Sequence, residues 1–210
     1  MTYARVQRLW PGETFVCIGG GPSLTPADVD RCRGRARVIA INDAYRLAPW
    51  ADVLYACDAK WWRWQMRDRS ETLASFAGLR YSIDPDAGRY PGVQILRNAG
   101  PDGLALQPDR LKHGRNSGYQ AINLAVHLGA RQIVLLGYDM QRAEDGRTHW
   151  FGSHPQGHTP FGDFLPRFSA LVEPLRAVGV SVVNCSRRTA LTAFPLGTLD
   201  ATFSLAEVAA

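Results

Sequence analysis

The 210-residue sequence lacks several features that would place it in a specialised class of protein. No apolar run approaches the ~18 residues that a membrane-spanning helix needs. The first residues, Met-Thr-Tyr-Ala-Arg-Val, hold no apolar signal core, which favours a cytoplasmic protein. The four cysteines form no Cys-x-x-Cys pair, so buried reduced thiols are expected rather than a metal or redox motif.

Lysine is also scarce, although the formal net charge is +5. Only Lys60 and Lys112 are lysines, whereas 22 residues are arginines. A guanidinium forms two-pronged hydrogen bonds with phosphates and carboxylates, so this excess suits an anionic ligand. A codon bias would give the same excess, because Ala, Gly and Pro are plentiful too. The sequence leaves both explanations open.

The remaining composition, with 46% hydrophobic and 20% charged residues, excludes a disordered, fibrous or coiled-coil protein. Short apolar runs alternate with helix-like segments, a pattern typical of α/β proteins. We therefore predict one α/β domain over residues 1–210. It has a Rossmann-like, mostly parallel sheet of about six or seven strands, with helices on both faces.

The strands are expected at residues 15–18, 37–41, 52–57, 132–136 and 180–183, with weaker candidates at 81–83 and 93–96. Helices are expected after a Thr25 cap, over about 59–76, from Asn116 to 128 and over about 161–178. Residues from about 142 to 160 are polar and rich in Gly and His, which predicts a long irregular loop of the functional kind. After about residue 200 we expect a C-terminal tail or a short helix.

Four of the predicted strands end in polar or glycine-rich sequence, and ligands of parallel sheets bind at that edge. Three consecutive glycines before Pro-Ser exceed what a turn requires, and glycine lets the backbone approach a phosphate at a helix N-terminus. These residues predict a nucleotide or other phosphate ligand. The predicted binding residues are Gly19, Gly20, Gly21, Pro22, Ser23, Asn42, Asp43, Asp58, Asn116, Ser117, Gly118, Gly137, Tyr138 and Asp139.

The glycine-rich loop does not match the two commonest nucleotide motifs. No G-x-x-x-x-G-K-[ST] sequence exists, which excludes a P-loop. Gly19-x-Gly21-x-x-Leu24 lacks the third glycine of the dinucleotide fingerprint, so a classical NAD site is not favoured either.

Seven other blocks of sequence, which follow one another along the chain, carry a resemblance to a known family. They are Gly19-Gly-Gly-Pro-Ser-Leu24, Ile41-Asn42-Asp43, Tyr55-Ala-Cys-Asp58, Asn116-Ser-Gly-Tyr119, Leu128 to Asp139, His149-Trp-Phe-Gly-Ser-His154 and Asn184-Cys-Ser186 with Leu191 and Phe194. In order, they resemble the motifs of glycosyltransferase family 42, the bacterial CMP-sialic-acid-dependent sialyltransferases. The resemblance implies a metal-independent transferase that moves a sugar from a nucleotide to a hydroxyl acceptor, with no cofactor beyond the nucleotide sugar.

Two other interpretations stay open, because a wider group shares the glycine loop and the Ser-Gly-Tyr helix. This group includes archaeal-type 6-hydroxymethylpterin diphosphokinases, which would imply ATP, Mg²⁺ and a pterin-like alcohol, and related phage proteins that associate with nucleic acid. For the transferase, the acceptor could equally be a saccharide, a protein or modified DNA. A homo-oligomer is also left open.

A transfer to a hydroxyl requires a base, and histidine is the side chain best poised near neutral pH. The resemblance favours His154 as the catalytic base, with His149 as the second candidate. Alternatively, both histidines merely cap a glycine-rich loop. A metal site with His158 is not favoured, because Pro155 and Gly157 prevent the helix that would align His154 and His158.

Two more segments contain residue types that often bind ligands, but neither of them predicts a site. Asp28 and Asp30 are expected on the surface of a short helix. The tryptophans Trp61, Trp62 and Trp64, interleaved with arginines, would suit single-stranded nucleic acid. A buried tryptophan face and a solvated arginine face are favoured for that helix.

Overall fold

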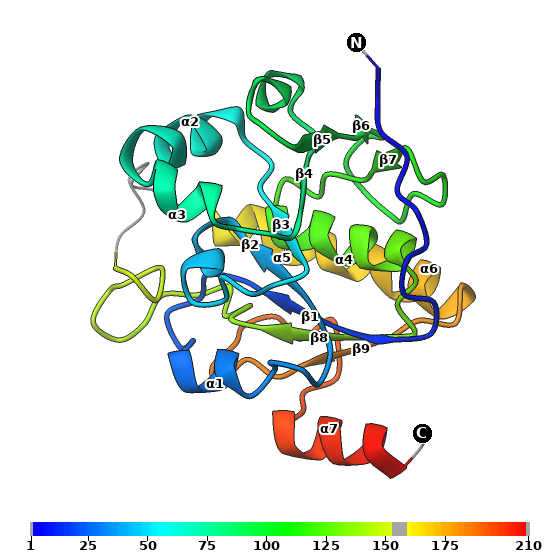
Figure 1. Ribbon diagram of the computed structural model, residues 1–210. Coiled ribbons are helices and arrows are strands. Elements are labelled where there is room, and N and C mark those ends of the chain that lie inside the picture. Colours follow the sequence, from blue (N-terminus) through cyan, green and yellow to red (C-terminus); the bar gives the residue numbers. More distant parts are fainter. Residues whose placement is uncertain (1, 153–158, 209–210) are drawn as a thin grey trace.

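The computed structural model describes residues 2–152 and 159–208, and it contains one seven-stranded, all-parallel sheet (Figure 1). The strand order is β5-β4-β3-β2-β1-β8-β9. The strands are β1 (Thr14–Ile18), β2 (Arg37–Ile41), β3 (Val53–Tyr55), β4 (Leu79–Ser82), β5 (Val93–Ile95), β8 (Gln132–Leu136) and β9 (Ser181–Asn184). The predicted Rossmann-like α/β fold is thus confirmed.

Helices follow most strands. They are α1 (Pro26–Asp30), α2 (Ala59–Asp68), α3 (Ser70–Ala74), α4 (Ser117–Leu128), α5 (Phe161–Phe168), α6 (Val172–Ala177) and α7 (Leu199–Val208), with 3-10 turns η1 (Asn42–Arg46), η2 (Pro85–Arg89) and η3 (Ser169–Leu171). The segment after residue 200 is therefore the helix α7 rather than a tail.

Two predicted helices are interrupted. The one expected over 59–76 divides into α2 and α3, because Arg69 has φ −148° and ψ 39°, which no α-helix accommodates. The one expected over 161–178 divides at η3 into α5 and α6. Pro174 has no backbone N–H, so it cannot continue the ladder of hydrogen bonds through this turn.

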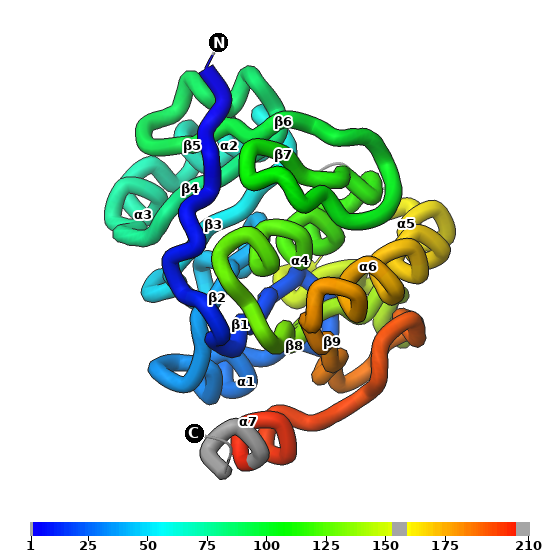
Figure 2. Tube along the Cα trace, turned by 90° about the vertical axis from the view of Figure 1, so that its right-hand side faces the viewer, coloured from blue at the N-terminus to red at the C-terminus, as the bar shows by residue number. Residues whose placement is uncertain are grey.

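Both faces of the sheet are buried. Phe15 and Cys17 point to one face and pack with α4, α5 and α6, whereas Val16 and Ile18 point to the other and pack with helices that include α1, α2 and α7. Figure 2 shows α4 and α6 on the opposite side of the sheet from α1 and α7. A strand covered on both faces needs an unbroken apolar sequence, and this explains why the strands were readable as short apolar runs.

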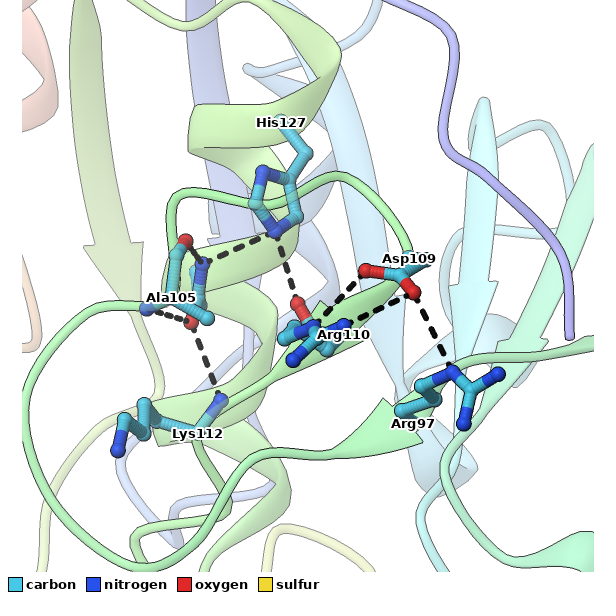
Figure 3. Close-up of polar contacts among 7 residues, drawn as sticks. Arg97, Ala105, Asp109, Arg110, Lys112 and His127 are labelled. Carbon is cyan, nitrogen blue, oxygen red and sulfur yellow. Dashed lines mark hydrogen bonds and ion pairs between the residues drawn. The ribbon is translucent and has the colours of Figure 1, made fainter.

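The weakly patterned segment before α4 is held by polar contacts. It carries a small parallel pair, β6 (Arg97–Asn98) and β7 (Arg110–Leu111). The buried Asn123 accepts hydrogen bonds from the backbone N–H groups of Ala105 (2.9 Å) and Lys112 (3.2 Å). His127 Nε2 lies 2.9 Å from the Arg110 carbonyl oxygen, and Asp109 contacts both arginines of the pair (Figure 3).

The first helix begins as predicted but is not on the surface. Thr25 and Asp28 form a reciprocal capping box. The prediction that Asp28 is exposed is wrong: its side chain is 5% exposed, and Arg187 donates to its two oxygens at 2.6 and 2.8 Å. A carboxylate is buried here because it has both a cap to complete and a guanidinium partner.

The tryptophan helix α2 has a buried face and a solvated face, as predicted. Trp61, Trp62 and Gln65 are buried, whereas Arg63 and Arg67 are exposed. Cys17, Cys32 and Cys185 are buried free thiols. No helix within residues 2–152 and 159–208 is both long and apolar enough to cross a membrane.

Candidate functional site

A pocket of about 250 Å³ opens where the strand order reverses, between β1 and β8. Parallel sheets bind ligands at such switch points, because the loops leaving the two strands diverge to opposite faces. The predicted residues that line the pocket are Gly19, Gly20, Gly21, Pro22, Asn42, Asp43, Asp58, Asn116, Ser117, Gly118, Gly137, Tyr138 and His149. Ser23 and Asp139 do not line it, and His154 falls outside the described residues.

The three glycines of the first loop have different reasons to be glycine. A Cβ on Gly19 would lie 2.7 Å from the Gly137 carbonyl oxygen, and one on Gly21 would lie 2.6 Å from the same atom. The Gly21 N–H donates to that oxygen at 2.8 Å. Gly19 and Gly21 therefore let the loop after β1 pack on the loop after β8. A Cβ on Gly20 would instead meet the His149 ring at 3.0 Å, so Gly20 is the glycine that lies against the histidine.

Asp139, which follows β8, holds the glycine loop after β1 in place. Its carboxylate is buried and accepts the Ser23 N–H at 2.7 Å. Burial raises the pKa of Asp139, and hydrogen bonds from Ser23 offset only part of that shift. Ser23 and Asp139 thus position the pocket wall without lining the pocket.

The start of α4 forms a second wall. The Asn116 side chain caps the helix by accepting from Gly118 N (2.8 Å) and Tyr119 N (3.2 Å). The amide of Gly118, one of the predicted binding residues, therefore donates to Asn116. The ring of Tyr138 packs on Gly118, and its hydroxyl donates to the Gly118 carbonyl oxygen at 3.0 Å.

The two acidic residues at the strand ends differ in their surroundings. Asp43 is 12% exposed and accepts from Trp61 Nε1 at 3.0 Å, and its other oxygen lies 3.4 Å from Gln65 Nε2. It thereby joins the end of β2 to α2. Asp58, the N-cap residue of α2, is exposed and lines the pocket. Asp58 is the better placed of the two to meet a ligand.

His149 lies in a tight turn over the glycine loop. The backbone N–H of His149 donates to the Gly152 carbonyl oxygen (3.1 Å), and the backbone N–H of Gly152 donates to the His149 carbonyl oxygen (3.0 Å). The backbone N–H of Trp150 donates to the Gly20 carbonyl oxygen (3.0 Å). The imidazole stacks on Phe151 with ring centroids 5.1 Å apart, and its Nδ1 lies 2.9 Å from the Thr148 hydroxyl. This turn belongs to the loop predicted at 142–160. The described residues of that loop, 142–152 and 159–160, form neither helix nor strand.

Arg46 packs between the turn that carries His149 and the end of β2. Its guanidinium carbon lies 5.1 Å from the centre of the Trp150 ring and 5.8 Å from that of Phe151. One of its nitrogens lies 3.4 Å from Asp43 Oδ1. Cation–π contacts of this kind, together with the bond from Trp150 to Gly20, hold His149 at the pocket.

Several lining residues were not predicted from the sequence. They include Ile41, Arg115, Met140, Thr148, Phe151, Thr159, Pro160, Phe161 and Phe164. Of the described residues, the non-glycines with positive φ are Asn42 (51°), Arg115 (56°) and Met140 (51°), and all three line the pocket. Such conformations gather at functional sites. Only Asn42 carried a sequence signal, because it follows a strand.

No group of three or more His, Cys, Asp or Glu side chains in the described parts of the chain is placed to hold a metal ion.

No protein-family model and no curated protein matches the sequence. Among solved structures, the fold is similar to that of the sialyltransferase CstII from Campylobacter jejuni, solved in complex with a substrate analogue, cytidine-5′-monophosphate. The TM-score is 0.55 at 13% sequence identity, over 88% of this chain and 84% of that one. The predicted resemblance to glycosyltransferase family 42 is therefore confirmed as a similarity of fold.

Proposed function

We propose that this protein is a nucleotide-sugar-dependent glycosyltransferase that acts on a hydroxyl acceptor without a metal cofactor. The observation that carries the proposal is the position of His149 above the glycine loop, at the switch point of a sheet. The solved structure of similar fold is a sialyltransferase in complex with cytidine-5′-monophosphate, which supports a nucleotide donor here.

In the proposed reaction, an acceptor oxygen attacks the anomeric carbon of the donor sugar. The bond between that carbon and the phosphate oxygen breaks, and its electron pair leaves with the nucleotide. The acceptor proton passes to a general base, for which His149 is the candidate within the described residues. In the tautomer whose Nδ1–H donates to the Thr148 hydroxyl, Nε2 is the nitrogen that takes the proton. His154 remains the candidate that the family resemblance favours.

The first experiment is a binding screen with CMP, UDP, GDP, ATP, NAD and CMP-sialate, read as a thermal shift and followed by turnover of the donor found. We expect a cytidine or other pyrimidine nucleotide to bind. Binding of ATP alone, with Mg²⁺-dependent turnover, would instead support the diphosphokinase. Salt-sensitive DNA binding without any nucleotide shift would support the nucleic-acid-associated protein.

The second experiment compares His149→Ala and His154→Ala. Loss of a general base typically lowers turnover by ~10²–10⁴ and leaves donor affinity nearly unchanged. The variant that removes the base should also lose the acidic limb of the pH–rate profile. Wild-type turnover in both variants, or loss of nucleotide binding in both, would show that the general base does not lie in this loop.

A further inference from the structure

Arg115 is the one lysine or arginine among the described residues that line the pocket. The undescribed segments 153–158 and 209–210 contain neither residue type, so they add no such cation. Two carboxylates, Asp43 and Asp58, line the same pocket. A nucleotide would bring further negative charge, and its departure from the sugar would add more. A fixed positive group is what such a site needs.

Two of the first amides of the helix beside the pocket are already engaged. The amides of Gly118 and Tyr119, at the start of α4, already donate to the Asn116 side chain. Within the described residues, the guanidinium of Arg115 has only a long ion pair with Asp163 (3.8 Å), and both side chains are more than half exposed. Exposed pairs of this length contribute little, so Arg115 can turn to an anionic ligand at small cost.

The backbone at Arg115 is one that favours glycine. Asn116 N–H donates to the His113 carbonyl oxygen at 3.0 Å, and the two residues between them, Gly114 and Arg115, have φ of 51° and 56°. Positive φ at both central positions is the signature of a type I′ turn, in which the second central residue, here Arg115, is commonly glycine. Arginine here costs conformational energy that glycine would avoid, and Arg115 lines the pocket. Strained positions of this kind gather at functional sites.

We propose that Arg115 binds the phosphate of the donor nucleotide and neutralises the charge that develops on it as the sugar leaves. This inference rests on the proposed glycosyl transfer. When the carbon–oxygen bond to the sugar breaks, its electron pair stays on the phosphate oxygen. The guanidinium of Arg115 pairs with that oxygen, while the acceptor proton goes to the base. Transfer then needs no metal ion at the phosphate.

The test compares Arg115→Gly and Arg115→Lys with one control, Arg176→Gln, which removes an exposed arginine from α6. The readout is the ratio of dissociation constants for each nucleoside and its monophosphate, with CMP and cytidine as the first pair. Melting temperature and turnover are measured in parallel.

We expect the wild-type protein and the Arg176→Gln control to bind the nucleotide at least ~10-fold more tightly than the nucleoside, because a charge-assisted hydrogen bond to the phosphate adds to the affinity. In Arg115→Gly the ratio should fall to within about twofold and turnover at least ~10²-fold, with no loss of melting temperature. Arg115→Lys should lie between. An unchanged ratio in Arg115→Gly would overturn the inference.

Failure of the parent proposal looks different. If the wild-type protein binds no nucleotide, glycosyl transfer is wrong, and inorganic pyrophosphate becomes the probe. Pyrophosphate bound by the wild-type protein and not by Arg115→Gly would still support an anion site at Arg115. Equal binding by both, or none by either, would overturn it.

Discussion

Ser23 donates its backbone N–H to the carboxylate of Asp139 at 2.7 Å, across 116 residues of sequence. This bond joins the loop after β1 to the loop after β8, the two strands that flank the switch point. Neither residue lines the pocket, yet both hold the glycine loop that does. Their role is therefore to set the geometry of the site, so substitutions around this bond should change stability as well as binding.

Replacement of Gly21 by alanine should destabilise the fold and disturb the pocket. The new Cβ would lie 2.6 Å from the Gly137 carbonyl oxygen and against the buried Asp139 carboxylate, and neither can move freely. Overpacking of this kind costs about 1–3 kcal/mol, measured by denaturant unfolding.

Two other glycines serve as controls for that experiment. Gly162 lies in α5 without a positive φ, and a Cβ added there would meet no atom of the described residues within 4 Å beyond its own stretch of helix. Gly162→Ala should therefore stabilise by about 0.5–1 kcal/mol. Gly20→Ala meets only the His149 ring, so it should alter ligand binding more than stability. Equal stability of the Gly21 and Gly162 variants would contradict the close packing of the two loops.

The contribution of Asp139 to stability should weaken as the pH rises. Burial raises its pKa in the folded protein above the ordinary 3.8, so the protonated form is the one that folding favours. Stability is then fully present below the unfolded pKa and is lost as the pH rises through the folded pKa. Each tenfold difference in the acid dissociation constant between the folded and unfolded protein corresponds to about 1.4 kcal/mol.

Asp139→Asn tests this pH dependence, because the amide cannot ionise and its oxygen can still accept from Ser23. The free energy of unfolding of the wild-type protein should fall relative to that of the variant between about pH 3 and pH 7. Urea titrations at several pH values measure the difference. A constant difference over this range would show that Asp139 does not carry a raised pKa.

Asp43 and Asp58 should separate into a structural and a ligand-facing residue. Asp43→Ala leaves the buried Trp61 N–H without its acceptor, which costs about 1–3 kcal/mol and should change the near-ultraviolet circular dichroism of the tryptophans. Asp58→Asn keeps the size and shape of an exposed side chain that lines the pocket, so nucleotide affinity should change more than stability. The reverse pattern would exchange the two roles.

Arg187→Gln should destabilise the protein at neutral pH and not in acid. Burial alone would raise the pKa of Asp28, but hydrogen bonds from Arg187 and Thr25 outweigh it, and the pKa falls below 3.8. The stabilisation is therefore present above the unfolded pKa and is lost as the pH falls through the folded one. At pH 7 we expect a loss of about 1–2 kcal/mol, because Arg187 itself is more than half exposed.

The adjacent arginine provides the matched control. Arg188 pairs with Glu144 on the surface, where both side chains are exposed. Arg188→Gln should therefore change the free energy of unfolding by no more than about 0.5 kcal/mol. Equal losses in the two variants would indicate a general effect of charge rather than the pair with Asp28.

The sequence by itself determined the α/β class and most of the strands. The expected strands at 37–41 and 132–136 match β2 and β8 residue for residue. Each is buried on both faces and flanked by polar or turn-forming sequence, so a short apolar run reports the element directly. The ends of these strands also pointed to the pocket, because parallel strands finish at one edge.

The tertiary structure alone decided which residues meet at that edge. The roles of Ser23 and Asp139 under the pocket follow from the pairing of β1 with β8, a contact between distant segments that no local pattern encodes. The same holds for Arg115 and for Phe164, which reach the pocket from a turn and from a later helix. Periodicity reports how each element is buried, whereas the strand order fixes which loops become neighbours, and that order arises from the packing of the whole chain.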